Sequence, residues 1–400
     1  MIKSINFLLS DTRPTYINPF FVFALAVLLG GILYSLKLSR LYGQYNHTLF
    51  WLMMALAGSS LLIGFLFSRI MKSRVSQEIE ISFVSSKNIY GICIFLWIIF
   101  ILECAEFGGI PLVMSLSGKE YNYKEFGIQT LHVLFVAYSS IFAVLCFYRW
   151  TAGTDNKYYL AGVFSVLSCN LLMMGRGGFV IIFFSCLFVY LSKVKNLKSA
   201  MLLLPALALI MVLAFGYFGD KRMQSSGYQD TRAILDIGQA GEDFFTRVLP
   251  SGFFWGYLYA SSPFANLLNQ DDMGNHGRGN FIDFIKVGLI PDFISKHFSG
   301  QERFSLYQIA PELTVGTAFG KSFVVLGYSG VVALFVWYCI FCFFVFLAAK
   351  RSHVIPACGV LCSMSAFMLF DNMLIFSNYC LQLLFLVVLA RFRISSIRLI

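Results

Sequence analysis

The stretch FVVLGYSGVVALFVWYCIFCFFVFLAA, residues 323–349, holds 27 residues and contains no Asp, Glu, Lys or Arg. An α-helix rises about 1.5 Å per residue, so about 20 residues cross the roughly 30 Å hydrocarbon core of a bilayer. Backbone N–H and C=O groups cannot remain unpaired in lipid, and an apolar run of this length therefore forms a helix rather than a strand. The stretch predicts a transmembrane helix.

The rest of the chain has the same character. It has 400 residues, of which 58% are hydrophobic and 12% charged, and its mean hydropathy is +0.75. Soluble domains carry roughly a quarter charged residues, so one or two soluble domains are excluded. The fold class predicted is an all-α polytopic membrane protein with about ten transmembrane helices. The predicted spans are 19–36, 49–68, 89–107, 131–148, 158–174, 178–192, 199–219, 323–349, 354–370 and 373–390.

One long polar segment interrupts this pattern. Residues 220–322 contain 11 of the 20 Asp and Glu of the chain, together with nine Lys and Arg. The segment divides the chain into a seven-helix part (1–219), a large extramembrane loop (220–322) and a three-helix part (323–400). Because most of the carboxylates lie in the loop, we expect the polar chemistry of the protein there or at its junctions with the membrane.

The basic residues predict an orientation. With the N-terminus inside, the segments facing the cytoplasm carry sixteen Lys and Arg, and the short segments facing outside carry five. Short cytoplasmic loops are enriched in Lys and Arg, whereas long loops cross the membrane regardless of charge. Both termini are therefore predicted in the cytoplasm and residues 220–322 outside. The net charge of +10 is then a signal of orientation, and no nucleic-acid partner is expected.

No metal or cofactor is predicted. All ten cysteines fall inside apolar runs, and no two of the five histidines have the spacing of metal ligands. The pair Cys339 and Cys342 lies in the middle of a span, where small packing residues are the simpler interpretation.

The candidate site residues are charges at the outer membrane boundary. Arg176 lies in the turn Gly175-Arg176-Gly177-Gly178 between two spans, where it either binds an anion or caps the turn. Arginine suits a diphosphate because its planar fork donates paired hydrogen bonds. Asp371 lies in the last outer turn. Glu103 and Glu106 share a helix face and predict either a functional site or a buried ion pair. Further candidates for diphosphate binding, each with a solvated surface role as the alternative, are Arg222, Arg232 and Arg247.

Three segments resemble a known family. They are WGYLYASSPFANL (255–267), TVGTAFG (314–320) with LGYSG (326–330), and the GRGG turn (175–178). Together with the layout of about ten spans and one late outer loop, they are similar to the Wzy-type O-antigen polymerases, which join oligosaccharide repeat units. The local motifs cover about forty residues. The resemblance implies a GT-C-like membrane fold in the bacterial inner membrane, with the loop in the periplasm.

The resemblance also implies a reaction and partners. A glycan growing on undecaprenyl diphosphate is transferred to the non-reducing end of a new lipid-linked unit, so the partners are undecaprenyl-diphosphate-linked oligosaccharides, membrane lipids and a chain-length regulator of the Wzz type. Arg176 would contact the leaving diphosphate. Arg278 and His276 would follow, in a glycine-rich run flexible enough to close over a glycan. A carboxylate or a histidine would take the acceptor proton; His276 is the candidate base, with a solvated loop histidine as the alternative, and Asp371 is a further catalytic candidate. Trp255 and Tyr257 either stack on sugars or anchor a helix at about 253–268 in the interface.

Two other functions stay open. An O-antigen ligase or another lipid-linked glycosyltransferase would share this layout, although the resemblance at 257–267 favours the polymerase. A transporter or flippase belongs to a different class, and it would show two related halves and broken helices near the midplane. Neither feature is visible in the sequence.

Overall fold

The computed structural model describes residues 17–43, 47–75, 86–117, 125–151, 156–194, 209–210, 212–213, 216–221, 223–224, 233–241 and 251–389. The regular elements in these ranges are helices, and one isolated bridge pairs Ser39 with Ala240. The helical class is confirmed. The helices are α2 (Pro19–Ser35), α3 (His47–Val75), α4 (Ser86–Phe107), α5 (Pro111–Leu116), α6 (Leu131–Thr151), α7 (Asn156–Leu172), α8 (Arg176–Lys193), α10 (Ala233–Ile237), α12 (Ser251–Asp272), α13 (Phe281–Phe284), the π-helix η2 (Ile285–Leu289), α14 (Asp292–Ser295), the 3-10 helix η3 (Gln301–Phe304), α15 (Gly320–Leu326), α16 (Tyr328–Ala348), the 3-10 helix η4 (Arg351–His353), α17 (Val354–Phe367) and α18 (Ser377–Leu389).

Five of these helices, α3, α4, α6, α8 and α16, are long and apolar enough to cross a membrane. Two more, α2 and α18, are apolar but shorter. Nine of the ten predicted spans fall on a helix of the structure, and most of the tenth, 199–219, lies outside the described residues. The membrane character is therefore supported, and the number of ten spans stays a prediction.

The predicted span 323–349 is not one continuous helix. Gly327 has φ 64° and ψ −145°, a conformation that side chains disfavour, and it separates α15 from α16. The seven-residue helix α15 packs against α12, α13 and η2, which all belong to the predicted outer loop. The hydropathy of an unbroken apolar run does not reveal the helix break at Gly327, because hydropathy is independent of the backbone angle φ.

Helix α2 shows how a single polar residue can join two spans. Asn18 caps α2, since its side-chain oxygen accepts from the N–H of Phe20 at 3.0 Å, and Pro19 follows at the first helical position. The amide of the same side chain donates to the backbone oxygen of Gly64 at 2.7 Å and to the hydroxyl of Ser68 at 2.8 Å, both on α3. One buried residue therefore begins α2 and binds it to α3.

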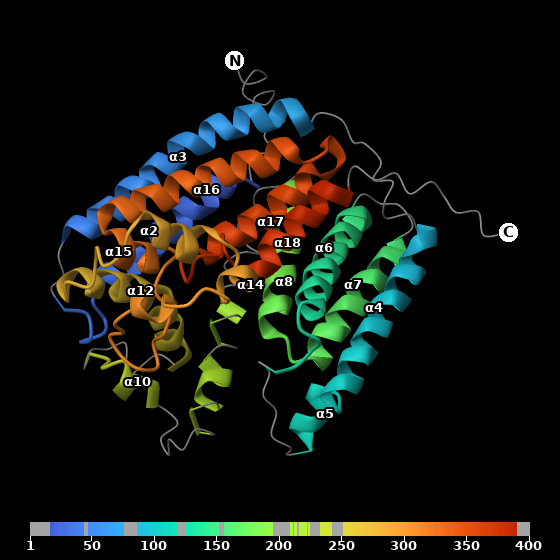
Figure 1. The fold of residues 1–400 in the computed structure, drawn as a ribbon, viewed down its shortest axis with the longest axis horizontal. Helices are drawn as coiled ribbons and strands as arrows, with labels where there is room; N and C mark the ends of the chain where they lie inside the picture. Colours follow the sequence, from blue (N-terminus) through green and yellow to red (C-terminus); the bar gives the residue numbers. More distant parts are fainter. Residues whose placement is uncertain are drawn as a thin grey trace.

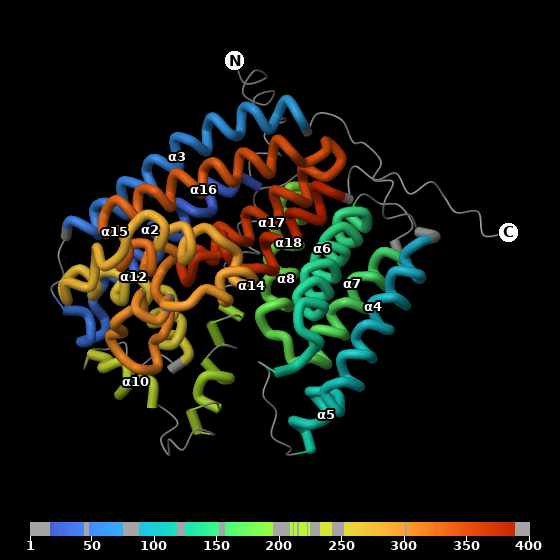
Figure 2. The backbone as a smooth tube through the Cα atoms, in the orientation of Figure 1, coloured from blue at the N-terminus to red at the C-terminus, as the bar shows by residue number. Residues whose placement is uncertain are grey.

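The spans form two groups with a pair of helices between them. Figure 1 shows α2, α3 and α16 on one side, with α12 and α15 beside them, and α4, α6 and α7 on the other side. Helices α17 and α18 lie in the middle, where α17 packs against both α2 and α8 and α18 packs against α6. The smooth trace in Figure 2 shows α14 approaching this middle pair. Helices α12 and α14 of the segment 220–322 are thus packed onto the spans.

Helix α12 is part of the core. It packs along α2, and Phe264 and Leu267 are fully buried. Trp255 and Tyr257 are 2% and 5% exposed. The indole N–H of Trp255 donates to Asp220 at 2.8 Å, and the hydroxyl of Tyr257 accepts from the N–H of Leu38 at 3.0 Å. The predicted interfacial helix is therefore an interior helix, and its two rings are turned away from any surface ligand.

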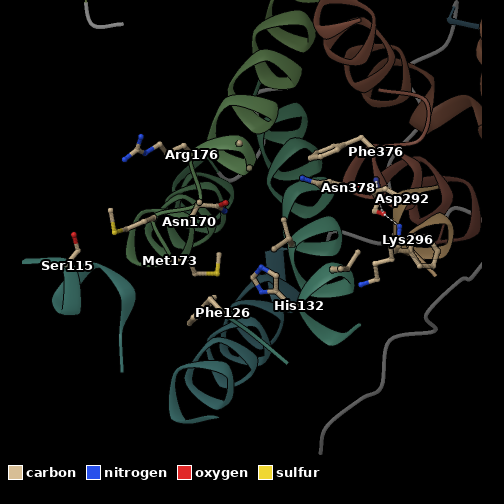
Figure 3. Close-up of a pocket in the computed structure, with 18 residues that line it drawn as sticks. Ser115, Phe126, His132, Asn170, Met173, Arg176, Asp292, Lys296, Phe376 and Asn378 are labelled. Atoms are coloured by element: carbon tan, nitrogen blue, oxygen red, sulfur yellow. Dashed lines mark hydrogen bonds between the residues drawn. The ribbon is translucent and has the colours of Figure 1, made fainter. Parts of the chain in front are cut away.

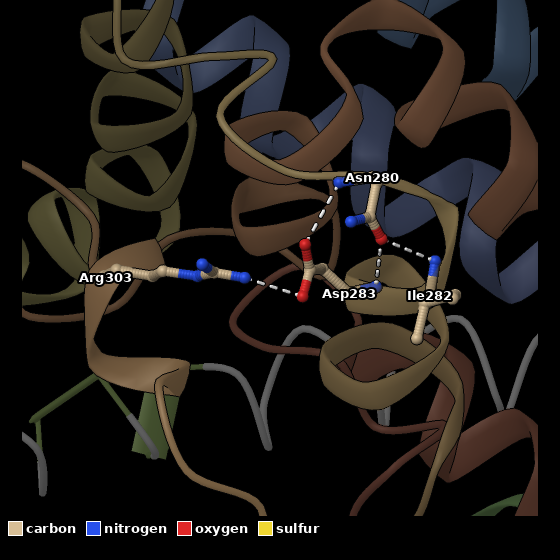
Figure 4. Close-up of polar contacts among 4 residues, drawn as sticks. All are labelled: Asn280, Ile282, Asp283 and Arg303. Atoms are coloured by element: carbon tan, nitrogen blue, oxygen red, sulfur yellow. Dashed lines mark hydrogen bonds and ion pairs between the residues drawn. The ribbon is translucent and has the colours of Figure 1, made fainter.

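Charged residues of the segment 220–322 also stabilise its short helices α13 and η3. Asn280 caps α13 by accepting from the N–H groups of Ile282 and Asp283, and the carboxylate of Asp283 accepts in return from the N–H of Asn280 (Figure 4). The other carboxylate oxygen pairs with Arg303 on η3 at 2.7 Å. Arg303 is consequently occupied in a structural ion pair.

Candidate functional site

A large cavity opens at the end of the bundle that the charge pattern predicts to face outside. Its volume is about 1120 Å³, above the roughly 300–1,000 Å³ of common ligand pockets. The walls are the start of α6, the turn between α7 and α8, helix α14, the start of α18 and part of α5. The residues that line it are Ser115, Phe126, His132, Val133, Val136, Asn170, Met173, Met174, Gly175, Arg176, Gly177, Gly178, Asp292, Phe293, Lys296, Phe376, Ser377 and Asn378.

Arg176 reaches this cavity as the first residue of α8. Its side chain is exposed and makes no hydrogen bond or ion pair with any described residue. The amides of Gly177 and Gly178 lie in the first turn of this 18-residue helix, where N–H groups lack intrahelical acceptors and the helix dipole favours an anion. Met174, just before the turn, has φ 56°, a strained value for a residue with a side chain. The predicted anion site at Arg176 therefore has a cavity beside it.

The turn is built around Asn170, the buried residue near the end of α7. Its backbone oxygen accepts from the N–H of Gly175 at 2.8 Å, and its side-chain amide donates to Val166 at 3.0 Å. A Cβ atom on Gly178 would overlap the side-chain oxygen of Asn170, whereas one on Gly177 would meet nothing within 4 Å. The glycine at 178 is thus required by a close approach, and the one at 177 is not.

The opposite wall carries a histidine paired with a buried carboxylate. His132, in the first turn of α6, has Nδ1 2.9 Å from Oε2 of Glu103 on α4. The Glu103 side chain is fully buried, and the His132 side chain is 31% exposed toward the cavity. The other carboxylate oxygen, Oε1, has no hydrogen-bond partner among the described residues. Of the two predictions for Glu103, the structure supports a buried pair, and it adds that this pair opens onto the cavity.

Asp292 is the one carboxylate among the lining residues, and it fastens α14 to α18. It accepts from the backbone N–H of Ser377 at 3.1 Å and from the Ser377 hydroxyl, which itself accepts from the N–H of Phe293 at 3.1 Å. Burial raises the pKa of the Asp292 carboxyl, and nearby Asp371 raises it further, against the lowering effect of the hydrogen bonds and Lys296. The carboxylate of Asp292 therefore holds α14 against α18. The ammonium of Lys296 faces the cavity.

Asn378 presents an amide to the same space. Its side-chain oxygen accepts from the buried Gln382 at 2.8 Å, which fixes the amide so that its nitrogen faces the cavity. Figure 3 shows Asn378, Asp292 and Lys296 on one side of the cavity with His132 below Asn378, while Arg176 points away from them on the side where Ser115 also lies. The lining carries the basic residues Arg176 and Lys296 and one carboxylate, Asp292, so its net charge is positive. Arg176 and Lys296 can bind an anion in this cavity, and the imidazole of His132 can accept a proton beside it.

Asp292→Asn is expected to raise the thermal stability of the protein near neutral pH. Because the folded-state pKa is raised, the stability linked to this carboxyl is complete below its ordinary pKa of 3.8 and is lost as the pH rises through the folded value. Asparagine stays neutral, and its oxygen can still accept from Ser377. The measurement is the melting temperature of the detergent-solubilised protein between about pH 4 and about pH 8.

The exposed Asp272 provides the matched control, because Asp272→Asn should change the melting temperature equally little at both ends of this range. A melting temperature of the Asp292→Asn protein below that of the original protein at neutral pH would show that the charge itself holds α14 in place.

The remaining predicted residues do not converge on Arg176. His276 lies beside α15, with Nε2 3.7 Å from Asp271, whose carboxylate accepts from Tyr328 at 2.7 Å. The guanidinium of Arg278 donates a 3.1 Å hydrogen bond to the hydroxyl of Tyr307 and lies over the ring of the same tyrosine. Figure 1 places α12 and α15 on the opposite side of the bundle from α6 and α8. Besides Arg176, the predicted catalytic residue that comes near the cavity is Asp371, whose charge acts on Asp292.

The glycine-rich run 274–279 is also less free than expected. The backbone N–H groups of Arg278 and Gly279 donate to Val324 and Val325 at 3.0 Å each, and the buried Asn275 donates to Gln270 at 2.7 Å. These bonds hold the run against α15, so the expected closure over a glycan is not favoured. Three predicted basic residues, Arg222, Arg232 and Arg247, lie outside the described residues.

Comparisons with known proteins add no relative. No protein-family model, curated protein or solved structure matches the chain.

Proposed function

We propose that this protein is a glycosyltransferase that polymerises lipid-linked O-antigen repeat units. It would transfer the growing glycan from undecaprenyl diphosphate to the non-reducing end of a new undecaprenyl-diphosphate-linked unit. The observation that carries the proposal is the cavity at the start of α8, which has a helix N-terminus, a net positive lining and a guanidinium that pairs with no described residue. These features suit a ligand with a concentrated negative charge, as a diphosphate has.

Arg176 is the contact for the leaving group. When the bond between the sugar and the diphosphate breaks, negative charge grows on the phosphate oxygen, and fixed donors aimed at that oxygen lower the barrier. A guanidinium remains charged at every physiological pH and can donate two parallel hydrogen bonds to one phosphate. Its exposed position at the edge of the bundle lets a lipid-borne diphosphate reach it from the membrane boundary.

The rest of the lining suits a lipid-linked glycan. Phe126, Met173, Met174 and Phe376 supply apolar surface for sugar faces and for the first part of the polyprenyl chain, while Asn378 and Lys296 can hydrogen-bond sugar hydroxyls. The volume of about 1120 Å³ leaves room for saccharides on both sides of the reacting carbon.

The cellular setting belongs to the same proposal. The cavity lies at the ends of α6, α7, α8 and α18 that face outside if both termini are cytoplasmic, as the excess of basic residues predicts. The protein would then work in the bacterial inner membrane with a GT-C-like arrangement of about ten spans and its large loop in the periplasm. A chain-length regulator of the Wzz type is the expected protein partner.

Deletion of the gene tests this function most simply. In a bacterium that makes smooth lipopolysaccharide, the deletion strain should show lipid A core capped with a single repeat unit when its lipopolysaccharide is separated on a gel. A strain without a polymerase can still export and ligate one unit, which is why one band should remain. Complete loss of O-antigen would point to a ligase or a flippase, and an unchanged ladder would exclude all three.

A further inference from the structure

Glu103 and His132 form a carboxylate–imidazole pair that has no role in binding the leaving group at Arg176. A carboxylate at membrane depth costs about 2.5–3.5 kcal/mol on insertion scales unless a partner compensates it. Here the fully buried Glu103 has His132 as its one described partner, at 2.9 Å, and the second carboxylate oxygen has none. A purely structural pair would be expected to satisfy both oxygens. The imidazole is also half-open to the cavity instead of enclosed.

The imidazole is held in one orientation. The ring of Phe126 meets it edge-on at 5.6 Å between centroids, and Nδ1 points to Glu103. Gly127 has φ 92°, and a Cβ there would lie 2.6 Å from the ring, so the backbone passes directly beneath the imidazole. Thr130, just before α6, has φ 66°. A positive φ at a threonine is strained, and such strain beside one side chain is typical of a functional site.

The second ring nitrogen is therefore free for chemistry. A neutral imidazole that donates from Nδ1 to a carboxylate has its lone pair on Nε2. No described residue hydrogen-bonds Nε2. This is the arrangement in which a carboxylate fixes the tautomer of a histidine and stabilises the imidazolium that forms when the histidine takes a proton.

We propose that His132 is the general base of the glycosyl transfer and that Glu103 is its positioning residue, an assignment that rests on the proposed function. The acceptor hydroxyl gives its proton to Nε2 of His132 while its oxygen forms a bond to C1 of the donor sugar. The C1–O bond to the diphosphate breaks, and undecaprenyl diphosphate leaves with the bonding electrons, its charge held by Arg176. The proton is later released from the imidazolium to water.

The geometry of the cavity agrees with His132 as the base and Arg176 as the contact for the leaving group. Figure 3 shows His132 and Arg176 on different sides of the cavity, so a glycan between them presents its diphosphate to Arg176 and its reacting carbon toward His132. His276, the candidate base from the resemblance, and the catalytic candidate Asp371 do not line the cavity.

The test uses membrane vesicles from the deletion strain, which hold the lipid-linked repeat units of that strain and receive either the original chain or a variant. His132→Asn keeps a donor for Glu103 near the position of Nδ1 but has no base. It should slow chain extension on gels by about 10²-fold to 10⁴-fold. Glu103→Gln should slow extension by about 10²-fold, because an amide can neither fix the tautomer nor stabilise the imidazolium.

The double variant separates a catalytic unit from two structural defects. If Glu103 acts through His132, then the double variant should extend chains as slowly as His132→Asn alone, whereas independent defects would multiply. Added imidazole should restore part of the rate to His132→Ala vesicles. Glu106→Gln, one helical turn away at an exposed position, is the matched control and should behave like the original chain.

The outcomes are distinct. If the original chain fails to extend the units, the proposed function falls. If it extends them and either His132→Asn or Glu103→Gln matches its rate at equal membrane levels, the function stands and the assignment of the base falls. The assignment also falls if the double variant is slower than His132→Asn by the full factor measured for Glu103→Gln, because the two residues then act independently.

Discussion

Arg176→Lys should slow chain extension in vesicles by about 10²-fold while the protein reaches the membrane at normal levels. Removal of one well-aimed donor to a developing oxyanion commonly costs 10²-fold to 10³-fold in rate. Lysine keeps the charge but loses the planar fork that can hold two phosphate oxygens. Arg176 is exposed, and its side chain makes no hydrogen bond or ion pair with a described residue, so folding should not suffer. Arg176→Ala should be slower still.

Arg278→Lys is the matched control for this change. Arg278 is also exposed and lies in the predicted outer region, but it contacts Tyr307 and is not part of the cavity. Extension should stay within about twofold of the original rate, as is usual for a surface substitution of this kind. Should Arg278→Lys lower the rate as strongly as Arg176→Lys, the leaving group would be bound at the other side of the bundle.

Gly178→Ala is expected to reduce extension by about 10²-fold and to lower stability by about 1–3 kcal/mol. The added methyl group would overlap the side-chain oxygen of Asn170, which is buried beneath the first turn of α8. Either Asn170 or the turn must move, and the guanidinium and the amides of that turn move with it. Small displacements of positioning groups can have large effects on rate.

Gly177→Ala gives the comparison within the same turn. A methyl group on Gly177 meets nothing within 4 Å, and alanine is a better helix former than glycine. The rate of extension should be unchanged and the melting temperature equal or slightly higher. Equal losses for the two alanine variants would mean that flexibility of the turn, and not the fit against Asn170, is what the glycines provide.

The predictable part of the structure is the helical class and the position of most spans. Continuous apolar runs such as 131–148 became helices close to their predicted limits, because backbone pairing in lipid leaves no alternative. The break at Gly327 was not predicted, since one positive φ leaves no mark in hydropathy. The interior position of Trp255 and Tyr257 was also missed, because aromatic residues are frequent both in cores and at interfaces.

The site was predictable in part. The sequence points to Arg176, because a charged residue between glycines at a membrane boundary is unusual, and to Glu103, because a carboxylate in an apolar run needs a partner. His132 was missed, although it begins the next span at the same predicted end. Lys296 and Asp292 were hidden among the charges of the long loop. Residues far apart in sequence meet through helix packing, which no single run of residues specifies.

Binding of undecaprenyl diphosphate to the purified protein tests most directly whether the cavity at the start of α8 is a diphosphate site. We expect the radiolabelled lipid to bind the original chain saturably and to be displaced by inorganic pyrophosphate, and we expect Arg176→Ala to lose most of this affinity while Arg278→Ala retains it. Equal affinity of the original chain and the Arg176→Ala variant, with both proteins folded, would contradict the proposed role of the cavity.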